Sequence, residues 1–147
     1  MDPQDPVPYT SESMLIRELP PAVIDSLLEA VGPGSGSRLV SVELRHGGGA
    51  LSQAPYDAGA LATLPGSFVT FAVGFVPVPE AMAPTRAWLG AFKASLEPYD
   101  AGRYFNFVEE SFDIAQIFPP EVLDRLREGK QRYDPENLFH SNHPVTG

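Results

Sequence analysis

Two stretches of the chain alternate between apolar and other side chains with the period of a β-strand. Within the stretch from Arg38 to Arg45, apolar residues at 40, 42 and 44 alternate with polar residues at 41, 43 and 45. Residues 67–76 also alternate, but both of their faces are apolar or small. A period of two predicts a strand at each place, the first half-buried and the second covered on both faces. A shorter strand-like piece is expected at 103–108.

Three further stretches have the spacing of amphipathic helices. The first carries apolar residues at 24, 27, 28 and 31, which fall on one helical face. A second helix is expected from about 80 or 84 to 96, and a third opens at Pro119 and Pro120. The inner stripe expected for the second helix is Trp88, Ala91, Phe92, Ser95 and Leu96. This order of helices and strands predicts an α+β fold, a small antiparallel sheet with helices packed on it.

The N-terminal segment lacks such a pattern. Residues 1–20 contain prolines at 3, 6, 8 and 20, so we expect an extended N-terminal arm followed by one α+β domain over residues 21–147. A chain of 147 residues suits a single domain of this kind. Residues 50–66 show no clear period, so they either form a functional loop or contain a short strand near 50–52.

Charge and composition exclude several classes of protein. The formal net charge is −9 and no basic cluster offsets it, which disfavours nucleic acid as a partner. The chain has no cysteine, so disulfides, thiol nucleophiles and cysteine-based zinc sites are excluded. No apolar run reaches the roughly 18 residues that span a bilayer, and the first residues lack the regions of a signal peptide. We therefore expect a cytoplasmic protein with no membrane partner.

The general catalytic motifs are weak in this sequence. The run HGGG at 46–49 resembles an esterase oxyanion loop, but the matching nucleophile motif is absent. His140 and His143 are three residues apart in a tail without a marked third ligand, so no metal site is expected. The adjacent acids Glu109 and Glu110 point apart on an extended chain, which is unfavourable for an acid–base pair.

A C-terminal run carries a more specific signal. Residues 125–139 read RLREGKQRYDPENLF, followed by SNHP at 141–144. This run resembles the closing segment of the berberine-bridge-enzyme-like flavoproteins, a branch of the FAD-linked oxidases. Two further stretches match that family in the right order: YFNF at 104–107 resembles its Tyr-x-Asn-Tyr/Phe element, and ELRHGGGAL at 43–51 resembles the strand before its Gly-Gly turn.

The resemblance implies both a function and a missing part. Family members are about three times as long, and their N-terminal portion is the FAD-binding domain. The present chain would correspond to part of the substrate domain, an antiparallel sheet with helices on one side, plus the C-terminal segment at about 103–145 that returns to the flavin domain. We therefore expect a substrate-domain portion of an FAD-dependent oxidoreductase, inactive alone, that acts on a small-molecule substrate.

The same resemblance selects candidate site residues. Asn106, Asn142 and His143 are expected near the flavin. Tyr104, Phe107 and Thr70 are expected to contact the substrate. Two departures touch catalysis: Phe107 replaces a proton-exchanging tyrosine or histidine, and the strand at 68–76 offers no carboxylate in the place that often supplies a base.

Alternative interpretations stay open at this point. The chain could be a stand-alone α+β binding or assembly module that has lost catalysis. Its partner could be a separate FAD-binding chain, or it could self-associate through the apolar strand at 68–76. In the C-terminal run, Leu138 and Phe139 could serve only as core anchors after a helix-ending turn. The substrate and the type of flavin linkage are not indicated.

Overall fold

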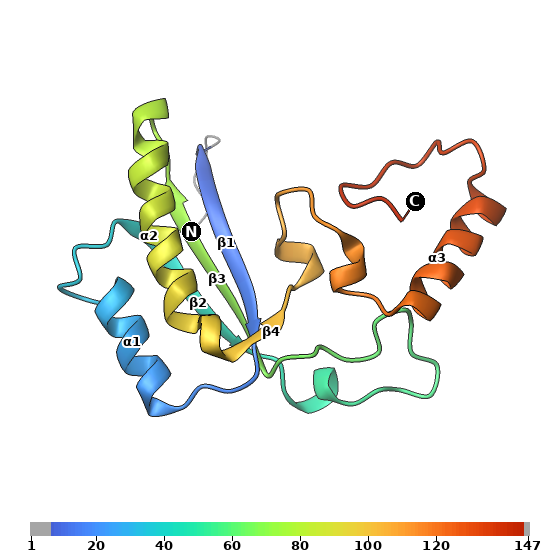
Figure 1. Cartoon of the computed structure of the whole chain (residues 1–147), viewed down its shortest axis with the longest axis horizontal. Helices are drawn as coiled ribbons and strands as arrows, with labels where there is room; N and C mark the ends of the chain where they lie inside the picture. The colour runs from blue at the N-terminus through green and yellow to red at the C-terminus, as the bar shows by residue number, and fades with distance from the viewer. Residues whose placement is uncertain (1–6, 146–147) are drawn as a thin grey trace.

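The computed structural model describes residues 7–145 and has the expected α+β architecture (Figure 1). A four-stranded antiparallel sheet has the order β2–β3–β1–β4. The strands are β1 (Tyr9–Ile16), β2 (Leu39–His46), β3 (Phe68–Phe75) and β4 (Asp100–Gly102). The helices are α1 (Pro21–Val31), α2 (Met82–Leu96) and α3 (Pro120–Tyr133). The three expected helices and the two longer expected strands are confirmed, with bounds that differ from the expected ones by a few residues.

The N-terminal segment differs most from the expectation. Residues 9–16 are not an arm outside the domain but the strand β1, which lies between β3 and β4. Met14, Leu15 and Ile16 are almost completely buried, so this strand is covered on both faces where it ends. Burial of that apolar triplet holds the strand in the sheet although prolines at 8 and 20 flank it. Residues 1–6, also part of the expected arm, lie outside the described residues.

The third expected strand is displaced. It occupies Asp100–Gly102, whereas Phe105–Phe107 forms a single 3-10 turn. The carboxylate of Asp100 accepts a hydrogen bond from the Gly102 N–H at 2.7 Å, and Gly102 has a φ of 113°. Glycine adopts that φ without a steric penalty, so the chain leaves the sheet here. The expectation of a strand over 103–108 is therefore wrong.

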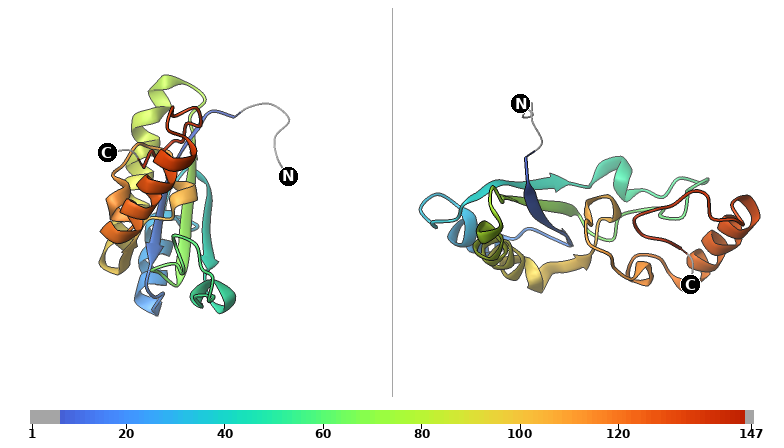
Figure 2. Two further views of the ribbon diagram at one scale, coloured as in Figure 1. Left: turned by 90° about the vertical axis from the view of Figure 1, so that its right-hand side faces the viewer. Right: turned by 90° about the horizontal axis from the view of Figure 1, so that it is seen from above.

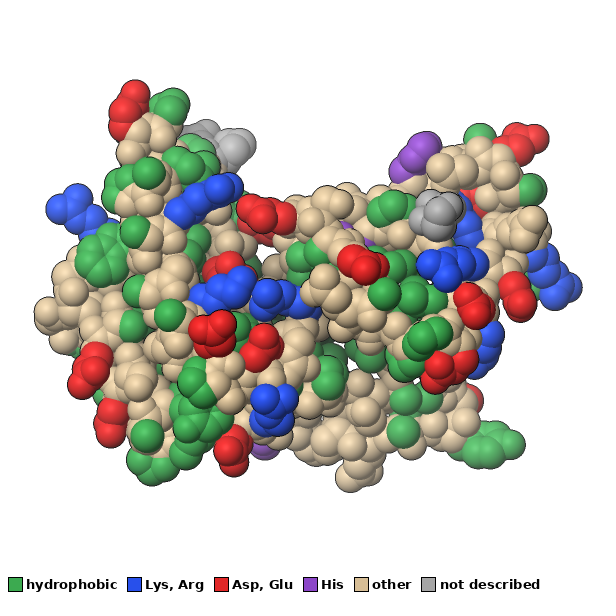
Figure 3. All heavy atoms as spheres, in the orientation of Figure 1, with side chains coloured by type: hydrophobic (Ala, Val, Ile, Leu, Met, Phe, Trp, Pro, Cys, Tyr) green, Lys and Arg blue, Asp and Glu red, His purple; other side chains and the backbone are tan. Residues whose placement is uncertain are grey.

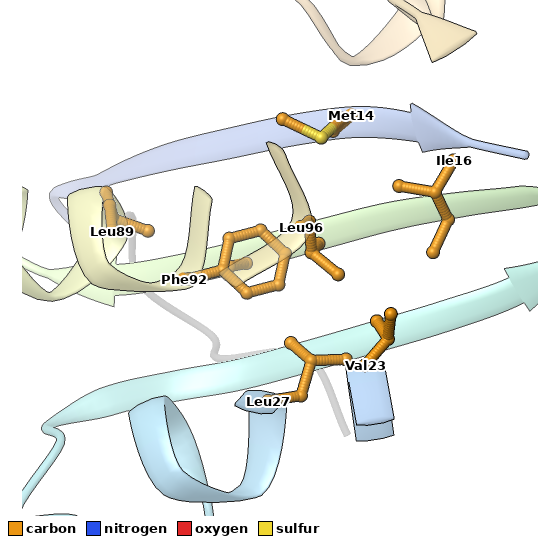
Figure 4. Packing of buried hydrophobic residues seen from close by; sticks show 8 residues of the cluster. Met14, Ile16, Val23, Leu27, Leu89, Phe92 and Leu96 are labelled. Atoms are coloured by element: carbon orange, nitrogen blue, oxygen red, sulfur yellow. The ribbon is translucent and has the colours of Figure 1, made fainter. Parts of the chain in front are cut away.

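The core lies between one face of the sheet and the helices α1 and α2 (Figure 4). Phe92 and Leu96 of α2 are completely buried, and Val23 and Leu27 come from α1. The inner stripe of α2 is rotated from the one expected, because Leu89 is buried while Trp88 is only half-buried. The prediction that both faces of β3 are covered is confirmed only in part: Thr70 and Ala72 on the helix-facing side are fully buried, whereas Phe71 and Val73 on the other side are half-buried and Phe75 is 41% exposed.

The chain after β4 forms a C-terminal lobe, residues 103–145, which contains α3. This lobe lies beside β1 and β4 rather than over the helices, as Figures 1 and 2 show. Within it, Phe105 faces the rings of Phe112 and Phe118 at centroid distances of 6.5 and 6.0 Å. The lobe therefore has a cluster of half-buried aromatic rings of its own, apart from the core of the sheet.

Across residues 7–145, no helix is long and apolar enough to cross a membrane.

Candidate functional site

The Tyr104–Phe107 element packs on the sheet face that α1 and α2 leave free. The Phe107 ring lies 4.8 Å from that of Phe71 and meets the ring of Tyr104 edge-on at 4.9 Å. The guanidinium of Arg45 lies 5.0 Å from the centre of the Phe107 ring. The Ser13 hydroxyl donates to the Phe107 carbonyl at 3.0 Å. Strand register places Ser13, Phe71 and Glu43 in one row across this face, so three strands support the element.

A polar groove of about 200 Å³ runs between β1, α2 and the start of the C-terminal lobe. Figure 3 shows charged side chains of both signs where these parts meet. The charged residues that line the polar groove are Glu12, Lys93, Arg103, Glu109 and Glu110. Lys93 pairs with Glu12 at 3.4 Å, and Arg103 donates to the Ser13 carbonyl at 3.4 Å. Cations and carboxylates thus both line the groove, which suits a ligand with many hydroxyl groups better than a strongly charged one.

Glu109 also acts on a tyrosine at the start of β1. A hydrogen bond to the Glu109 carboxylate, together with its negative charge, raises the pKa of Tyr9 above its usual value. Tyr9 therefore keeps its proton throughout the neutral range and serves as a hydrogen-bond donor.

A second cavity, the tail cavity, has a volume of about 220 Å³. Its lining residues are Phe105, Asn106, Val108, Ser141, Asn142 and His143. The three residues expected near the flavin therefore converge on one cavity. Asn106 and Asn142 are both exposed, and the Asn106 amide donates to the Tyr104 hydroxyl at 3.3 Å. His143 differs, because it is only 6% exposed and bonds to the Val108 carbonyl.

The expected substrate contacts divide into two groups. Tyr104 and Phe107 lie on the free face of the sheet, and Phe107 lines the polar groove. Thr70 has no exposed surface, and its hydroxyl donates to the Met14 carbonyl at 2.9 Å. It shares the helix-facing side of β3 with Ala72, so it has neither access nor a free hydrogen-bonding group for a substrate. Thr70 is thus a core residue in this structure, contrary to the expectation.

Acid–base and metal-binding groups are sparse around the tail cavity. No carboxylate appears among its lining residues. Among residues 7–145 there is no group of three or more histidine, aspartate and glutamate side chains that could hold a metal ion. The tail cavity can therefore orient a ligand through amide and hydroxyl groups, but its own lining offers no carboxylate base.

The C-terminal run folds into a turn organised by one carboxylate. Asp134 accepts hydrogen bonds from the Leu138 N–H at 2.7 Å, from the Phe139 N–H at 3.0 Å and from the Lys130 ammonium. The same ammonium donates to the Phe139 carbonyl at 2.6 Å. Asn137 has a φ of 52°, a conformation that asparagine tolerates better than most residues. The lysine, aspartate and asparagine of the run are thus explained by the turn.

That turn leaves its large apolar side chains outside. Tyr133, Leu138 and Phe139 are 78%, 70% and 77% exposed. Leu138 and Phe139 are therefore not core anchors, which corrects that interpretation of the run.

We expect Asp134→Asn to loosen this turn. The Lys130 hydrogen bond is the main reason that the pKa of Asp134 lies below its ordinary value of 3.8; desolvation opposes it, and the Phe139 and Leu138 N–H groups reinforce it. Because the pKa of Asp134 is lower in the folded chain, its ionised carboxylate stabilises the turn at pH values above 3.8. This stabilisation is lost as the pH falls through the folded-state pKa. Protection of the Leu138 and Phe139 amides from exchange should fall about tenfold in the variant, and in the parent chain it should fall only as the pH drops below 3.8 through the lowered folded-state pKa.

The matched control is Asp124→Asn, because Asp124 makes only an exposed pair with Arg127 at 3.3 Å. Exchange at Leu138 should be unchanged there. Equal exchange in both variants would show that Asp134 does not organise the turn.

Sequence reasoning missed Arg45 and Phe71. Arg45 stands at an outward position of the predicted strand 38–45, and Phe71 is one of several apolar residues on the next strand. The alternation shows which residues of its own strand each shares a face with. Only the register of β2 with β3 and the contacts of Phe107 show that both residues lie beneath that ring.

Comparison with known proteins agrees with the resemblance seen in the sequence. Residues 103–146 match the family model described as berberine and berberine like. The chain is also similar to a xylooligosaccharide oxidase of Thermothelomyces thermophilus, with 27% identity over 146 aligned residues. That alignment covers 90% of this chain but 29% of the relative, so the chain spans less than a third of the relative's length. The predicted resemblance to the C-terminal part of a berberine-bridge-enzyme-like oxidase is therefore confirmed.

Proposed function

We propose that these 147 residues form the substrate-side part of an FAD-dependent oxidoreductase. They would work with an FAD-binding module, supplied by the same polypeptide or by another chain. The observation that carries the proposal is the convergence of Asn106 and Asn142, distant in the sequence, on one cavity within the segment that matches the family. Two exposed amides beside the apolar wall of Phe105 fit the polar edge and flat face of a flavin ring.

The division of chemistry follows from the groups present. The flavin would accept the hydride. Asn106 and Asn142 would orient the ring or the substrate by hydrogen bonds, and Phe107 would supply an apolar contact without exchanging a proton. Since the tail cavity has no lining carboxylate, the proton acceptor would come from the polar groove or from the FAD-binding module.

The exposed apolar side chains of the C-terminal turn support a docking role. Tyr133, Leu138 and Phe139 lie within the matched segment and project outward. Covering them with an FAD-binding module would bury apolar surface worth about 25 cal/mol per Å². We propose that this turn is the contact with that module.

The polar groove supports a carbohydrate-like substrate. The similar oxidase is named for a xylooligosaccharide, a chain of polyhydroxylated rings. Paired charges and serines in the groove can donate to and accept from sugar hydroxyls, and the Phe107 ring lies at its wall. A stand-alone binding module is the competing function, and it predicts sugar binding without any flavin partner.

The isolated chain should not hold FAD tightly. Its sequence lacks a dinucleotide-binding fingerprint, and a net charge of −9 disfavours the pyrophosphate group. Titration of FAD followed by flavin fluorescence should give a dissociation constant weaker than micromolar. Micromolar or tighter binding by the chain alone would contradict the proposed division into two parts.

Adding a family FAD-binding module should then give a complex that retains flavin through gel filtration. Leu138→Asp should abolish that complex, because it places a charge on the proposed contact. Leu28→Asp is the matched control, since Leu28 is 54% exposed on α1, away from the turn. Equal loss in both variants would argue against docking through the C-terminal turn.

A further inference from the structure

We propose that His143 is a positioning residue that pins the loop 105–112 to the C-terminal tail and so sets the shape of both cavities. Its Nε2 lies 2.9 Å from the Val108 carbonyl oxygen, across 35 positions of sequence. A carbonyl oxygen only accepts, so Nε2 must donate. The side chain is 6% exposed, and water therefore competes little for this hydrogen bond.

Two aromatic rings hold the imidazole in place. Its centroid lies 5.2 Å from that of Phe105, with 60° between the planes, and 4.7 Å from that of Phe112, with 68°. These tilted and edge-on contacts come from the two ends of the loop. The ring therefore fills the space inside the loop while its Nε2 bonds to the middle of it.

The second ring nitrogen shows which tautomer is held. Nδ1 is buried and has no hydrogen-bond partner among the described residues. Since Nε2 donates to Val108, the single proton of a neutral ring lies on Nε2 and leaves Nδ1 without one. His143 is thus oriented by one hydrogen bond and by packing, with no second polar contact to share the role.

The loop that His143 holds is a wall of both cavities. Val108 lines the polar groove and the tail cavity, Phe112 lines the groove, and Phe105 lines the tail cavity. A substitution of His143 is therefore expected to alter the shape of the polar groove without any substitution in β1 or α2. This places His143 between the two proposed binding regions and assigns it a role separate from direct cofactor contact.

The test compares two variants that remove different parts of the contact. His143→Phe keeps an aromatic ring but lacks the donor, whereas His143→Gln keeps an N–H at similar reach but lacks the ring. We expect amide exchange over 105–112 to be at least about tenfold faster in His143→Phe, and His143→Gln to restore most of the protection. His140→Phe is the control, because His140 is exposed in the same tail.

Exchange in β3 serves as an internal reference that each variant is folded. If His143→Phe protects the loop as well as the parent chain does, or if His143→Gln loses protection as fully as His143→Phe, the hydrogen bond does not position the loop and the proposal fails. Nitrogen NMR of the unmodified chain gives a second measurement, in which the proton of the neutral ring is expected on Nε2 and finding it on Nδ1 overturns the proposal. Both experiments use the chain without flavin, so their failure would leave the proposed oxidoreductase function untouched.

Discussion

Phe92→Ala should unfold a large share of the chain at physiological temperature. Phe92 has no exposed surface and lies at the centre of the cluster between the sheet and its helices (Figure 4). Removing a buried phenyl ring costs about 3–5 kcal/mol, from lost burial and from the cavity left behind. Domains of this size are stabilised by only about 5–15 kcal/mol, so urea unfolding should shift strongly towards lower concentration.

A phenylalanine on the other lobe is the matched control. Phe139 is 77% exposed, so Phe139→Ala should change the free energy of unfolding by less than about 0.5 kcal/mol. A large loss in Phe139→Ala together with a small one in Phe92→Ala would mean that the core has been placed wrongly.

The second large effect concerns catalysis in the complete enzyme. Asn106→Ala and Asn142→Ala should each slow substrate-driven flavin reduction about ten- to a hundred-fold. Loss of a polar contact in a closed site costs roughly 1–3 kcal/mol, which corresponds to that range. The rate should be followed as the decay of the visible flavin absorbance after mixing with substrate in the absence of oxygen.

Histidines outside the tail cavity provide the controls. His46 is exposed, with its ring tilted against Phe68 at a centroid distance of 5.1 Å, and His140 is also exposed, so alanine at either position should leave the rate within about twofold of the parent. Parental rates in both asparagine variants, with loss of activity in His46→Ala, would overturn the assignment of the site.

Local periodicity predicted most of the elements, because their pattern is contained in a short stretch of chain. β2, β3 and the three helices follow from apolar spacing alone. β1 could not be found in that way, since its own serines and the prolines that flank it hide a pattern that becomes clear only when β3 and β4 pair on either side. The displaced β4 likewise depends on a local turn, in which Asp100 caps the Gly102 N–H.

The candidate site depended on longer-range information. Residue spacing cannot bring Asn106 and Asn142 together, and the family resemblance supplied that expectation. Thr70 was misplaced because both faces of β3 are apolar or small, so the sequence does not show which one meets the helices. The role of His143 was also hidden, since a histidine in a proline-containing tail gives no sign that two phenyl rings from a distant loop will enclose it.

The most direct test of the proposed function is flavin reduction by a xylooligosaccharide with and without this chain. An FAD-binding module of the family should be mixed with substrate in the absence of oxygen, alone and after complex formation with the 147-residue chain. We predict that the flavin absorbance bleaches only in the complex, since the chain supplies the substrate groove and the amides of the tail cavity. Equal bleaching by the module alone, or none with any substrate once the complex has formed, would contradict the proposal that this chain is the substrate-side part of an FAD-dependent oxidoreductase.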